Sequence, residues 1–198
     1  ESLDKVIEKA KKPLNPNNFE TLANVSGALI LDTRNANDFA NGFIPNSINI
    51  GIDGSFTMWV GEMISDINQA ILLVTEPGKE EECMIRLSRV GYDNTIGYLE
   101  GGFASWKQAE KEMDSLKRIT GQELEEMLST IDLSLFDVRK KSEFDSEHLL
   151  NSTNIPLNQL NAKLDSFPKE KLFVIYCAGG YRSMIAASIL KQRGFDNF

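Results

Sequence analysis

Residues 172–183 read Leu172-Phe173-Val174-Ile175-Tyr176-Cys177-Ala178-Gly179-Gly180-Tyr181-Arg182-Ser183. An apolar run rich in β-branched and aromatic residues stops at a cysteine, and an apolar-rich helical pattern from Met184 to Lys191 follows the glycines. The pattern predicts a buried strand, a tight loop and a helix, with Cys177 at the strand end. Strands and helices alternate in this way along most of the chain, which predicts an α/β fold with a largely parallel sheet.

The surroundings expected for Cys177 favour its thiolate form. Backbone N–H groups of the short loop and the N-terminus of the following helix would face the sulfur, and Arg182 adds a permanent positive charge. The thiolate is the nucleophilic form of cysteine, so we expect Cys177 to be a catalytic nucleophile. The alternative is an inert buried cysteine, but such a residue has no need of a glycine-rich, cationic loop. Cys83 falls inside a helical pattern and is expected to be a core residue.

Composition limits the fold class and the partners. The chain has 198 residues, enough for one large domain or two small ones, and 41% of them are apolar. Its net charge of −8 argues against nucleic acid and anionic membranes as partners. No apolar run is long enough for a membrane span. The first residue is Glu1 rather than Met, and no signal peptide opens the chain, so we expect an excised or processed piece.

Cysteine and histidine usage narrows the chemistry further. The chain has two cysteines, and their spacing is not that of metal ligands. We expect no disulfide framework, and a reducing, cytoplasmic compartment is the simpler setting. His148 is the single histidine, so the chain offers no His-rich metal site, and we expect neither a metal nor a cofactor. A catalytic pair of the Ser–His or Cys–His kind would have to use His148.

The sequence repeats itself at a nearly constant spacing. An offset of 105 residues aligns Asp32-Thr33-Arg34 with Asp137-Val138-Arg139. Further along, an offset of 103 residues aligns Gly91–Asn94 with Gly194–Asn197. Identities at polar positions over such a distance predict two copies of one α/β domain. We expect each copy to hold a mainly parallel five-stranded sheet flanked by helices.

The repeat also predicts domain boundaries. Residues 1–12 are expected to form an N-terminal tail or linker helix, residues 13–114 the first domain and residues 115–198 the second. Residues 96–107 of the first copy have no counterpart in the second. The second domain is therefore expected to be incomplete at its C-terminus, without its last strand and helix.

The two copies differ at the reactive position. The first-copy match to Cys177 is Val74, or Thr75 if the loop differs by one residue, and neither is a nucleophilic cysteine. The loop Thr75–Glu82 is acidic, so it would repel an anionic substrate and destabilise a thiolate. We expect the first domain to be degenerate and the second to contain the site.

Several motifs of this chain resemble those of the rhodanese family. The first is Asp-x-Arg after a strand, which both copies contain, and the second is Leu-Glu-Gly-Gly-x-x-x-Trp at Leu99–Trp106. The third is a Cys-x4-Arg-Ser loop that begins at Cys177. The family's Gly-His-Ile-Pro stretch has its counterparts in Gly42–Pro45 and Glu147–Leu150. Together these motifs span nearly the whole chain.

The resemblance implies a tandem rhodanese-domain sulfurtransferase. In that family a cysteine takes a sulfane sulfur from a donor such as thiosulfate or a low-molecular-weight persulfide. It holds the sulfur as a persulfide and passes it to a thiophilic acceptor, such as a thiol or a cyanide-like anion. The cysteine role falls on Cys177, and Asp137, Arg139 and His148 take structural roles. The loop that binds the substrate or the persulfide would consist of Ala178, Gly179, Gly180, Tyr181, Arg182 and Ser183.

The residues support this chemistry independently. Attack of a thiolate on a sulfane sulfur resembles thiol–disulfide exchange and needs no proton relay. Arg182 would either bind an anionic donor or stabilise the loop, and Tyr181 would either shape substrate access or lie on the surface. The loop length argues against a cysteine phosphatase or arsenate reductase, because the phosphatase loop, Cys-x5-Arg, is one residue longer.

A further resemblance concerns the whole protein. Pro77–Glu82 and Val90–Gly102 are similar to segments of fusion proteins in which a metallo-β-lactamase-like persulfide dioxygenase precedes a C-terminal rhodanese pair. This resemblance implies an N-terminal metallo-β-lactamase-like domain outside the present sequence. The alternative function is then a non-catalytic docking or regulatory rhodanese pair of a larger metallo-β-lactamase-fold hydrolase or persulfide dioxygenase.

Overall fold

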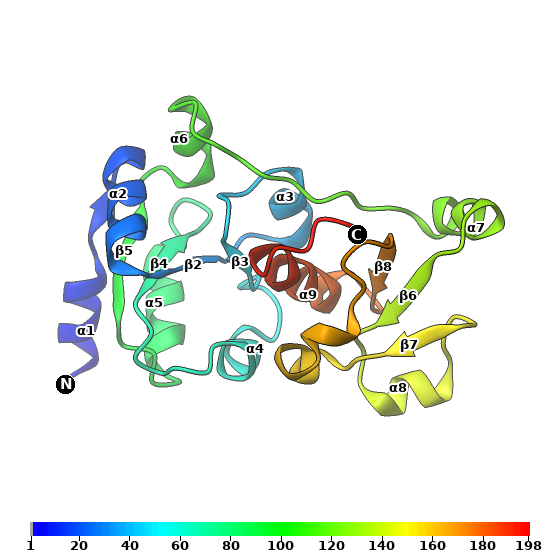
Figure 1. Ribbon diagram of the computed structural model, residues 1–198. Helices are drawn as coiled ribbons and strands as arrows, with labels where there is room; N and C mark the ends of the chain where they lie inside the picture. Colours follow the sequence, from blue (N-terminus) through cyan, green and yellow to red (C-terminus); the bar gives the residue numbers. More distant parts are fainter. Residues whose placement is uncertain (1) are drawn as a thin grey trace. The chain divides into compact units, whose positions relative to one another are not determined.

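The structure, a computed structural model, describes residues 2–198 in two compact units (Figure 1). The first unit runs to Ser115, and the second spans Leu116–Phe198. Each combines a parallel sheet with helices, so the predicted α/β fold class is confirmed. Within residues 2–198, no helix combines the length and the apolar character that a membrane crossing requires.

The first unit contains a five-stranded parallel sheet with the strand order β1-β5-β4-β2-β3. Strands β2 and β4 are paired from Leu29↔Ile71 to Asp32↔Val74, so the loops that follow them leave the same edge of the sheet. The elements of this unit are α1 (Leu3–Ala10), β1 (Pro13–Leu14), α2 (Pro16–Ser26), β2 (Leu29–Asp32), α3 (Ala36–Asn41), β3 (Ile48–Asn49), α4 (Phe56–Met63), β4 (Ile71–Val74), α5 (Glu80–Ser88), β5 (Thr95–Leu99) and α6 (Gly102–Gln108).

The second unit contains a three-stranded parallel sheet with the strand order β7-β6-β8. Two short 3₁₀ helices, η1 (Leu157–Ala162) and η2 (Leu164–Ser166), precede β8. The remaining elements are α7 (Gly121–Thr130), β6 (Ser134–Asp137), α8 (Lys141–Ser146), β7 (Ser152–Asn154), β8 (Phe173–Tyr176) and α9 (Tyr181–Gln192).

The prediction of a five-stranded sheet is therefore wrong for the second unit. Its strands β7, β6 and β8 correspond to β3, β2 and β4 of the first unit. Residues 116–198 contain no counterpart of β5. In the first unit β1 pairs with β5 alone, so the counterpart of β1, at Arg118–Ile119, has no strand to pair with and stays irregular.

The two units share backbone details that confirm the sequence repeat. Asn46 and Asn151, 105 residues apart, both adopt positive φ angles, of 66° and 61°. Gly78 and Gly180, which follow β4 and β8, both have a φ of 89°. A side chain at either glycine position would be strained, because L-residues rarely adopt this conformation. The backbone therefore adopts the same conformation at corresponding positions of the two units.

Corresponding helices of the two units begin at side-chain caps. In α2 the side chain of Asn15 accepts a hydrogen bond from the Asn18 N–H at 2.9 Å, and Pro16 occupies the first helical position. In α7 Thr120 and Glu123 form a reciprocal capping box. These caps fix the start of the helix that precedes the first long strand of each unit.

Helix α1 is part of the first unit. Its buried residues Val6, Ile7 and Ala10 pack in a helix that contacts α5 and β5. Residues 1–12 were expected to be a tail or linker helix. The described part of this segment does form a helix, which packs onto the first unit.

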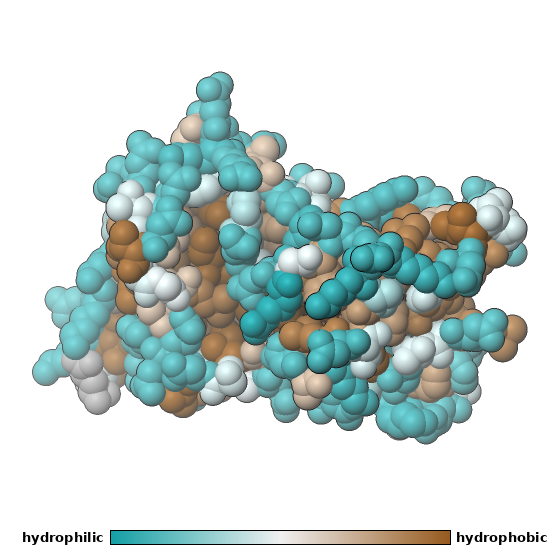
Figure 2. All heavy atoms as spheres, in the orientation of Figure 1, coloured by the Kyte–Doolittle hydropathy of each residue, from teal (hydrophilic) through white to brown (hydrophobic). Residues whose placement is uncertain are grey.

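The cores of the two units differ in how completely they are covered. All four residues of β4 are fully buried, whereas in β8 Phe173 is buried and the other three residues are half-buried. The second unit also exposes Leu128, Ile131 and Leu172 by 45%, 44% and 41%. Figure 2 shows apolar atoms at the surface around α7. One side of the second unit thus leaves apolar groups open to solvent.

Candidate active site

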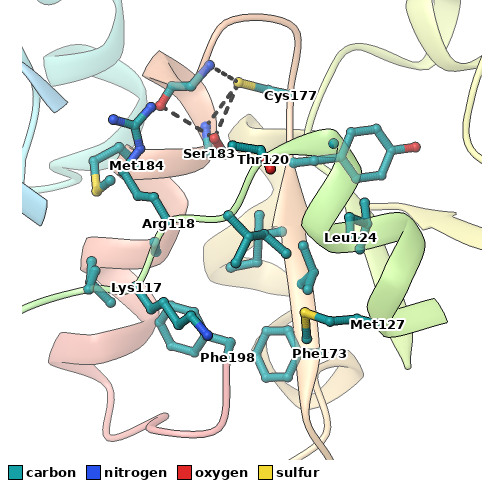
Figure 3. A pocket seen from close by; sticks show the side chains of 18 of the residues that line it. Lys117, Arg118, Thr120, Leu124, Met127, Phe173, Cys177, Ser183, Met184 and Phe198 are labelled. Atoms are coloured by element: carbon teal, nitrogen blue, oxygen red, sulfur yellow. Dashed lines mark hydrogen bonds between the residues drawn. The ribbon is translucent and has the colours of Figure 1, made fainter. Parts of the chain in front are cut away.

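Cys177 lies between β8 and α9, as the sequence predicted for a residue at a strand end. Its Sγ accepts hydrogen bonds from the backbone N–H groups of Gly180 at 3.2 Å and Ser183 at 3.4 Å (Figure 3). The thiol is also 3.4 Å from the Ser183 Oγ, to which it donates. The loop bends back around the sulfur because Gly180 adopts a φ of 89°.

Two opposing influences act on the pKa of Cys177. Burial, the largest single cause, raises it, because a charged sulfur loses hydration. Hydrogen bonds to the sulfur stabilise the thiolate; they come from the Ser183 hydroxyl and from the backbone N–H groups of Ser183, Gly179 and Gly180. Together they outweigh burial, so the pKa of Cys177 lies below its usual value. The N-terminus of α9 adds a favourable dipole at the same place. The site therefore favours a nucleophilic sulfur.

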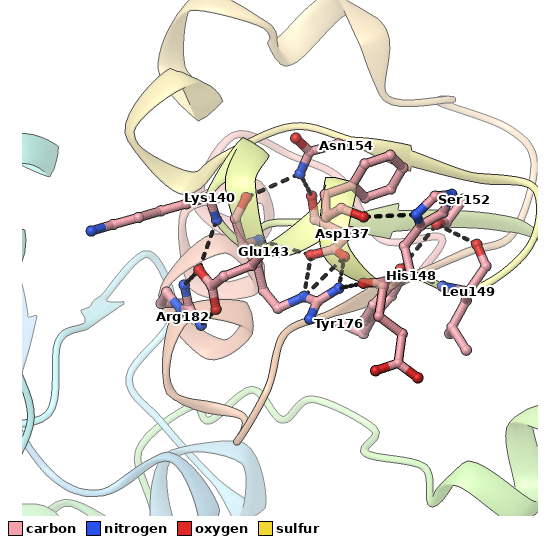
Figure 4. A network of polar contacts seen from close by, with 12 residues as sticks. Asp137, Lys140, Glu143, His148, Leu149, Ser152, Asn154, Tyr176 and Arg182 are labelled. Carbon is pink, nitrogen blue, oxygen red and sulfur yellow. Dashed lines mark hydrogen bonds and ion pairs between the residues drawn. The ribbon is translucent and has the colours of Figure 1, made fainter.

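Arg182 is held by a carboxylate that the sequence analysis did not single out. Its guanidinium donates to both carboxylate oxygens of Glu143, at 2.6 and 2.9 Å (Figure 4). The hydrogen bonds from the Arg182 guanidinium are the largest influence on the pKa of Glu143 and lower it to about 2. Of the two roles considered for Arg182, this geometry favours stabilisation of the loop. Ala178 and Gly179 lie exposed at the loop tip, and Tyr181 is half-buried at the start of α9.

Asp137 and Arg139 form a fork at the carboxyl end of β6. The Arg139 guanidinium binds both carboxylate oxygens of Asp137, the closest at 2.6 Å, and also the carbonyl of Glu147 at 2.7 Å. Asn154 donates to the carbonyls of Asp137 and Arg139, which joins β7 to the same network (Figure 4). The fork fixes the edge of the sheet from which the Cys177 loop departs.

The first unit contains the same fork. The guanidinium of Arg34 binds both carboxylate oxygens of Asp32 and reaches the carbonyl of Gly42 at 2.9 Å. Because the unit without a cysteine at its loop keeps this arrangement, the fork serves the fold in both units.

His148 lies outside the immediate surroundings of Cys177. Its ring stacks on Phe144 with the ring centres 3.8 Å apart, and its Nδ1 lies 2.7 Å from the Phe144 carbonyl. The residue is exposed and does not line the groove next to Cys177, as far as residues 2–198 describe it. His148 is therefore a surface residue at the end of α8, and its position does not support a catalytic pair with Cys177.

A groove of about 590 Å³ opens beside Cys177. Residues 116–121 form one wall and residues 172–178 the other, and Leu124 and Met127 of α7 line it as well (Figure 3). Arg118 is the second residue that the sequence analysis missed. Its Nη2 lies 3.3 Å from the position that a Cβ would take on Gly180, so a cation stands directly against the loop. No local sequence pattern indicates this contact.

In the first unit, Thr75 takes the place of Cys177, because it directly follows β4 as Cys177 follows β8. The N–H of Gly78, the counterpart of Gly180, donates to the Glu80 carboxylate at 3.1 Å. The amide that would stabilise a thiolate is thus used by an acidic side chain. Cys83 is fully buried, 3.3 Å from the Thr33 hydroxyl, and burial raises the pKa of its thiol to about 11.

The described residues also bear on metal binding. Within residues 2–198, no three or more His, Cys, Asp and Glu side chains are grouped in a way that could hold a metal ion.

The chain is similar to several proteins of known sequence. An adenylyltransferase and sulfurtransferase of Ogataea parapolymorpha is 42% identical over 65 residues, which cover 32% of this chain and 16% of that protein. A tRNA sulfurtransferase of Thermoplasma acidophilum is 33% identical over 67 residues, which cover 34% of this chain and 13% of that protein. In the first relatives the matched part spans less than half of the relative's length.

The chain also matches a solved structure at low identity, and a family model matches two of its segments. The crystal structure of a thiosulfate sulfurtransferase from Pseudomonas aeruginosa matches with 20% identity and a TM-score of 0.44, over 95% of this chain and 42% of that one. The model of the rhodanese-like domain matches residues 15–109 and again residues 120–198. The chain therefore belongs to the family of proteins built from rhodanese-like domains, two of which it contains in tandem.

Proposed function

We propose that the second unit is a sulfurtransferase that carries a sulfane sulfur as a persulfide on Cys177. The donor is thiosulfate or a low-molecular-weight persulfide, and the acceptor is a thiophilic group such as a thiol or a cyanide-like anion. The observation that carries the proposal is the pair of backbone N–H groups, from Gly180 and Ser183, at 3.2 and 3.4 Å from the sulfur. Sulfur transfer of a general kind is also the activity in the names of the related sulfurtransferases.

The reaction consists of two displacements at sulfur. The Cys177 thiolate attacks the outer sulfur of the donor. A new S–S bond forms while the donor's own S–S bond breaks, and the electron pair leaves with sulfite or with the donor's thiolate. The acceptor then attacks the terminal sulfur of the persulfide, and Cys177 leaves as a thiolate. Electrons balance within each step, so the cycle consumes no external oxidant or reductant.

The loop suits both states of the cysteine. In the free enzyme the amides of Gly180 and Ser183 hold the thiolate, and the loop of exposed Ala178 and Gly179 leaves room for one additional sulfur. A persulfide anion places its charge on the terminal sulfur, where further N–H groups of the loop and the dipole of α9 can stabilise it. Stabilising an anion before and after transfer is what this chemistry demands of a site.

The charges around the loop determine which donors fit. The bidentate ion pair with Glu143 compensates the charge of Arg182. The guanidinium of Arg118, exposed and close to Gly180, then supplies the positive charge that attracts an anionic donor. In this proposal Arg182 positions the loop and Arg118 meets the donor. A reduced thiol is required throughout, so we place the protein in a reducing compartment such as the cytoplasm.

Intact mass measurement tests the proposal. The full chain is incubated with thiosulfate or with glutathione persulfide, freed of donor and weighed without reductant. We expect a gain of one sulfur atom located on the Cys177 peptide. Cys177→Ser should abolish the gain, and Cys83→Ala is the matched control that should keep it. An unchanged mass in a folded wild-type chain, or an equal gain in Cys177→Ser, would contradict the proposal.

The non-catalytic alternative is not favoured for the second unit, because an inert docking domain has no use for a cysteine held by two backbone N–H groups. In the first unit Thr75 replaces the nucleophile, and there an architectural role is the simpler proposal. A metallo-β-lactamase-like domain as an N-terminal partner remains a proposal based on sequence resemblance. Limited proteolysis of the intact natural protein would test it through the size of the fragments.

A further inference from the structure

The ion pair between Glu143 and Arg182 distinguishes the second unit from the first. Arg182 lies two residues beyond the glycine that follows β8 with a φ of 89°, and Glu80 lies at the same place after β4. Asp38, 105 residues before Glu143, is the counterpart of that residue. The first unit thus has two acidic residues where the second has an acid and a base.

The turn of the loop does not depend on this ion pair. Gly78 adopts the same φ of 89° as Gly180, although the acidic residues of the first unit are engaged elsewhere. Glu80 accepts a hydrogen bond from the Gly78 N–H at 3.1 Å, and Asp38 accepts one at 2.6 Å from a side-chain amide three residues earlier. The Asp-x-Arg fork occurs in both units and serves the fold, whereas this ion pair accompanies the reactive cysteine. It therefore has a further role, in the chemistry of the loop.

The ion pair compensates a positive charge beside the cysteine. The Arg182 guanidinium, 19% exposed, donates to both oxygens of the Glu143 carboxylate. The pKa of that carboxyl is about 2, so the pair stays ionised at neutral pH. The hydrogen bonds to Glu143 raise the pKa of Arg182 most, and the charge of the Cys177 thiolate raises it further. The carboxylate thus offsets a cation that would otherwise act at full strength on Cys177 and on an anion beside it.

The possible donors differ in the charge that they bring to the sulfur. Thiosulfate carries two negative charges on one small ion, whereas a low-molecular-weight persulfide carries at most one on its sulfurs. A thiolate that attacks a dianion meets like-charge repulsion, which nearby cations must offset. Arg118 stands against Gly180 and attracts anions, but the compensated Arg182 adds little to it.

From these contacts we infer that Glu143 is a specificity-determining residue for the sulfur donor. By compensating Arg182, it holds the positive charge at the loop to a level that suits persulfides of small thiols and disfavours dianionic thiosulfate. Its carboxylate contacts Arg182 and the backbone N–H of Lys140, so it acts on the donor through Arg182 (Figure 4). The inference rests on the proposed sulfur transfer at Cys177 and narrows its donor.

Two alkylating reagents of nearly equal size test the charge at Cys177 without sulfur transfer. Iodoacetate is an anion and iodoacetamide is neutral, and both lose iodide to the same thiolate, so the ratio of their rates cancels changes in the thiolate fraction. In Glu143→Gln the released charge of Arg182 should raise the ratio of the iodoacetate rate to the iodoacetamide rate about threefold. A merely structural loosening of the loop would change both rates alike. Glu143→Asp, which retains a carboxylate, should keep the wild-type ratio.

Two further variants show whether Glu143 acts through Arg182. Asp145→Asn is the matched control, because it removes a carboxylate of the same helix that pairs with Lys141 instead, and it should leave the ratio unchanged. The double variant Glu143→Gln with Arg182→Gln should return to the wild-type ratio, since the released cation is absent. An unchanged ratio in Glu143→Gln, or a raised ratio that persists in the double variant, would overturn the inference.

Sulfur loading then connects the charge with the donor. The rate of mass gain at Cys177 is measured with thiosulfate and with glutathione persulfide at equal concentrations. The wild type should load faster from the persulfide, and Glu143→Gln should shift the ratio of the two rates about threefold towards thiosulfate. Faster loading of the wild type from thiosulfate, or the same ratio in both chains, would refute the donor assignment. If neither donor adds sulfur to any chain, the proposed function fails and the donor assignment with it, while the alkylation ratio still reports the charge role of Glu143.

Discussion

The Ser183→Ala variant removes one of the groups that hold the Cys177 sulfur while leaving the backbone in place. The Ser183 hydroxyl lies 3.4 Å from Sγ, and its hydrogen bond lowers the pKa of Cys177. The amide of residue 183, also 3.4 Å from the sulfur, remains in the variant. The substitution therefore isolates the hydroxyl from the backbone cradle and should raise the pKa of Cys177.

The size of the effect follows from the geometry. A hydrogen bond to a charged group contributes about 1.5–3 kcal/mol, and the long 3.4 Å contact places this one near the lower limit. Since ~1.4 kcal/mol is a factor of ten in an equilibrium constant, loss of the hydroxyl should raise the pKa of Cys177 by making thiolate formation about tenfold less favourable. The thiolate fraction at pH below both pKa values then falls about tenfold. A more basic thiolate is also a better nucleophile, by roughly threefold per unit for a Brønsted coefficient of 0.4–0.5.

The net prediction is a difference in alkylation rate between Ser183→Ala and the wild type that reverses with pH. Alkylation of Cys177 by iodoacetamide should be about threefold slower in Ser183→Ala at low pH and about threefold faster at pH above both pKa values. The assay is the pH dependence of the alkylation rate, with Ser188→Ala as a matched serine of the same helix. A midpoint unchanged within ~0.3 unit, or a uniform loss of rate at all pH values, would refute the assigned role of the hydroxyl.

Four further predictions concern other parts of the two units. At pH 8 iodoacetamide should label Cys177 and spare Cys83, whose pKa is about 11, until urea is added, as peptide mapping would show. Glu143→Gln should lower the unfolding midpoint at pH 7. The pKa of Glu143 is lowered to about 2 in the folded chain, so the ionised carboxylate stabilises the fold fully at pH above the ordinary pKa of a glutamate. This stabilisation is lost as the pH falls from there towards 2, so the difference in unfolding midpoint between Glu143→Gln and the wild type should shrink in acid. Asp137→Asn should cost about 3 kcal/mol in urea unfolding of the second unit, since it breaks a buried ion pair. Thr75→Cys in a Cys177→Ser background should give a thiol that alkylates more slowly than Cys177 itself, and an equal rate would show that the acidic loop is no obstacle.

The features that the sequence predicts well are those that local patterns encode. The apolar run before Cys177 and the glycines after it are adjacent in the sequence, as are Asp137 and Arg139. The structure shows the strand end that the first pattern predicts and a structural ion pair between the two residues of the second. The repeat is similarly visible because its offset is nearly constant. The catalytic roles given to Cys177 and its loop stay predictions until the sulfur is followed chemically.

The features that sequence reasoning missed depend on contacts between distant residues. Glu143 precedes Arg182 by 39 positions, and nothing near either residue indicates that the two will meet. Arg118 reaches the loop from the segment before α7, where its neighbours suggest a linker. The strand count of the second unit failed because a parallel strand needs a neighbour, and the counterpart of β1 lacks one. Local periodicity cannot report such dependencies.

The most direct test of the account follows one isotopically labelled sulfane sulfur through a single cycle. The donor carries the label on its outer sulfur, and samples are quenched over time for peptide mass analysis and for analysis of the acceptor thiol. The account predicts that label appears first on the Cys177 peptide and then, at the rate of its loss from that peptide, in the acceptor. Label that reaches the acceptor equally fast in Cys177→Ser, or that stays on Cys177 when acceptor is added, would contradict the central claim.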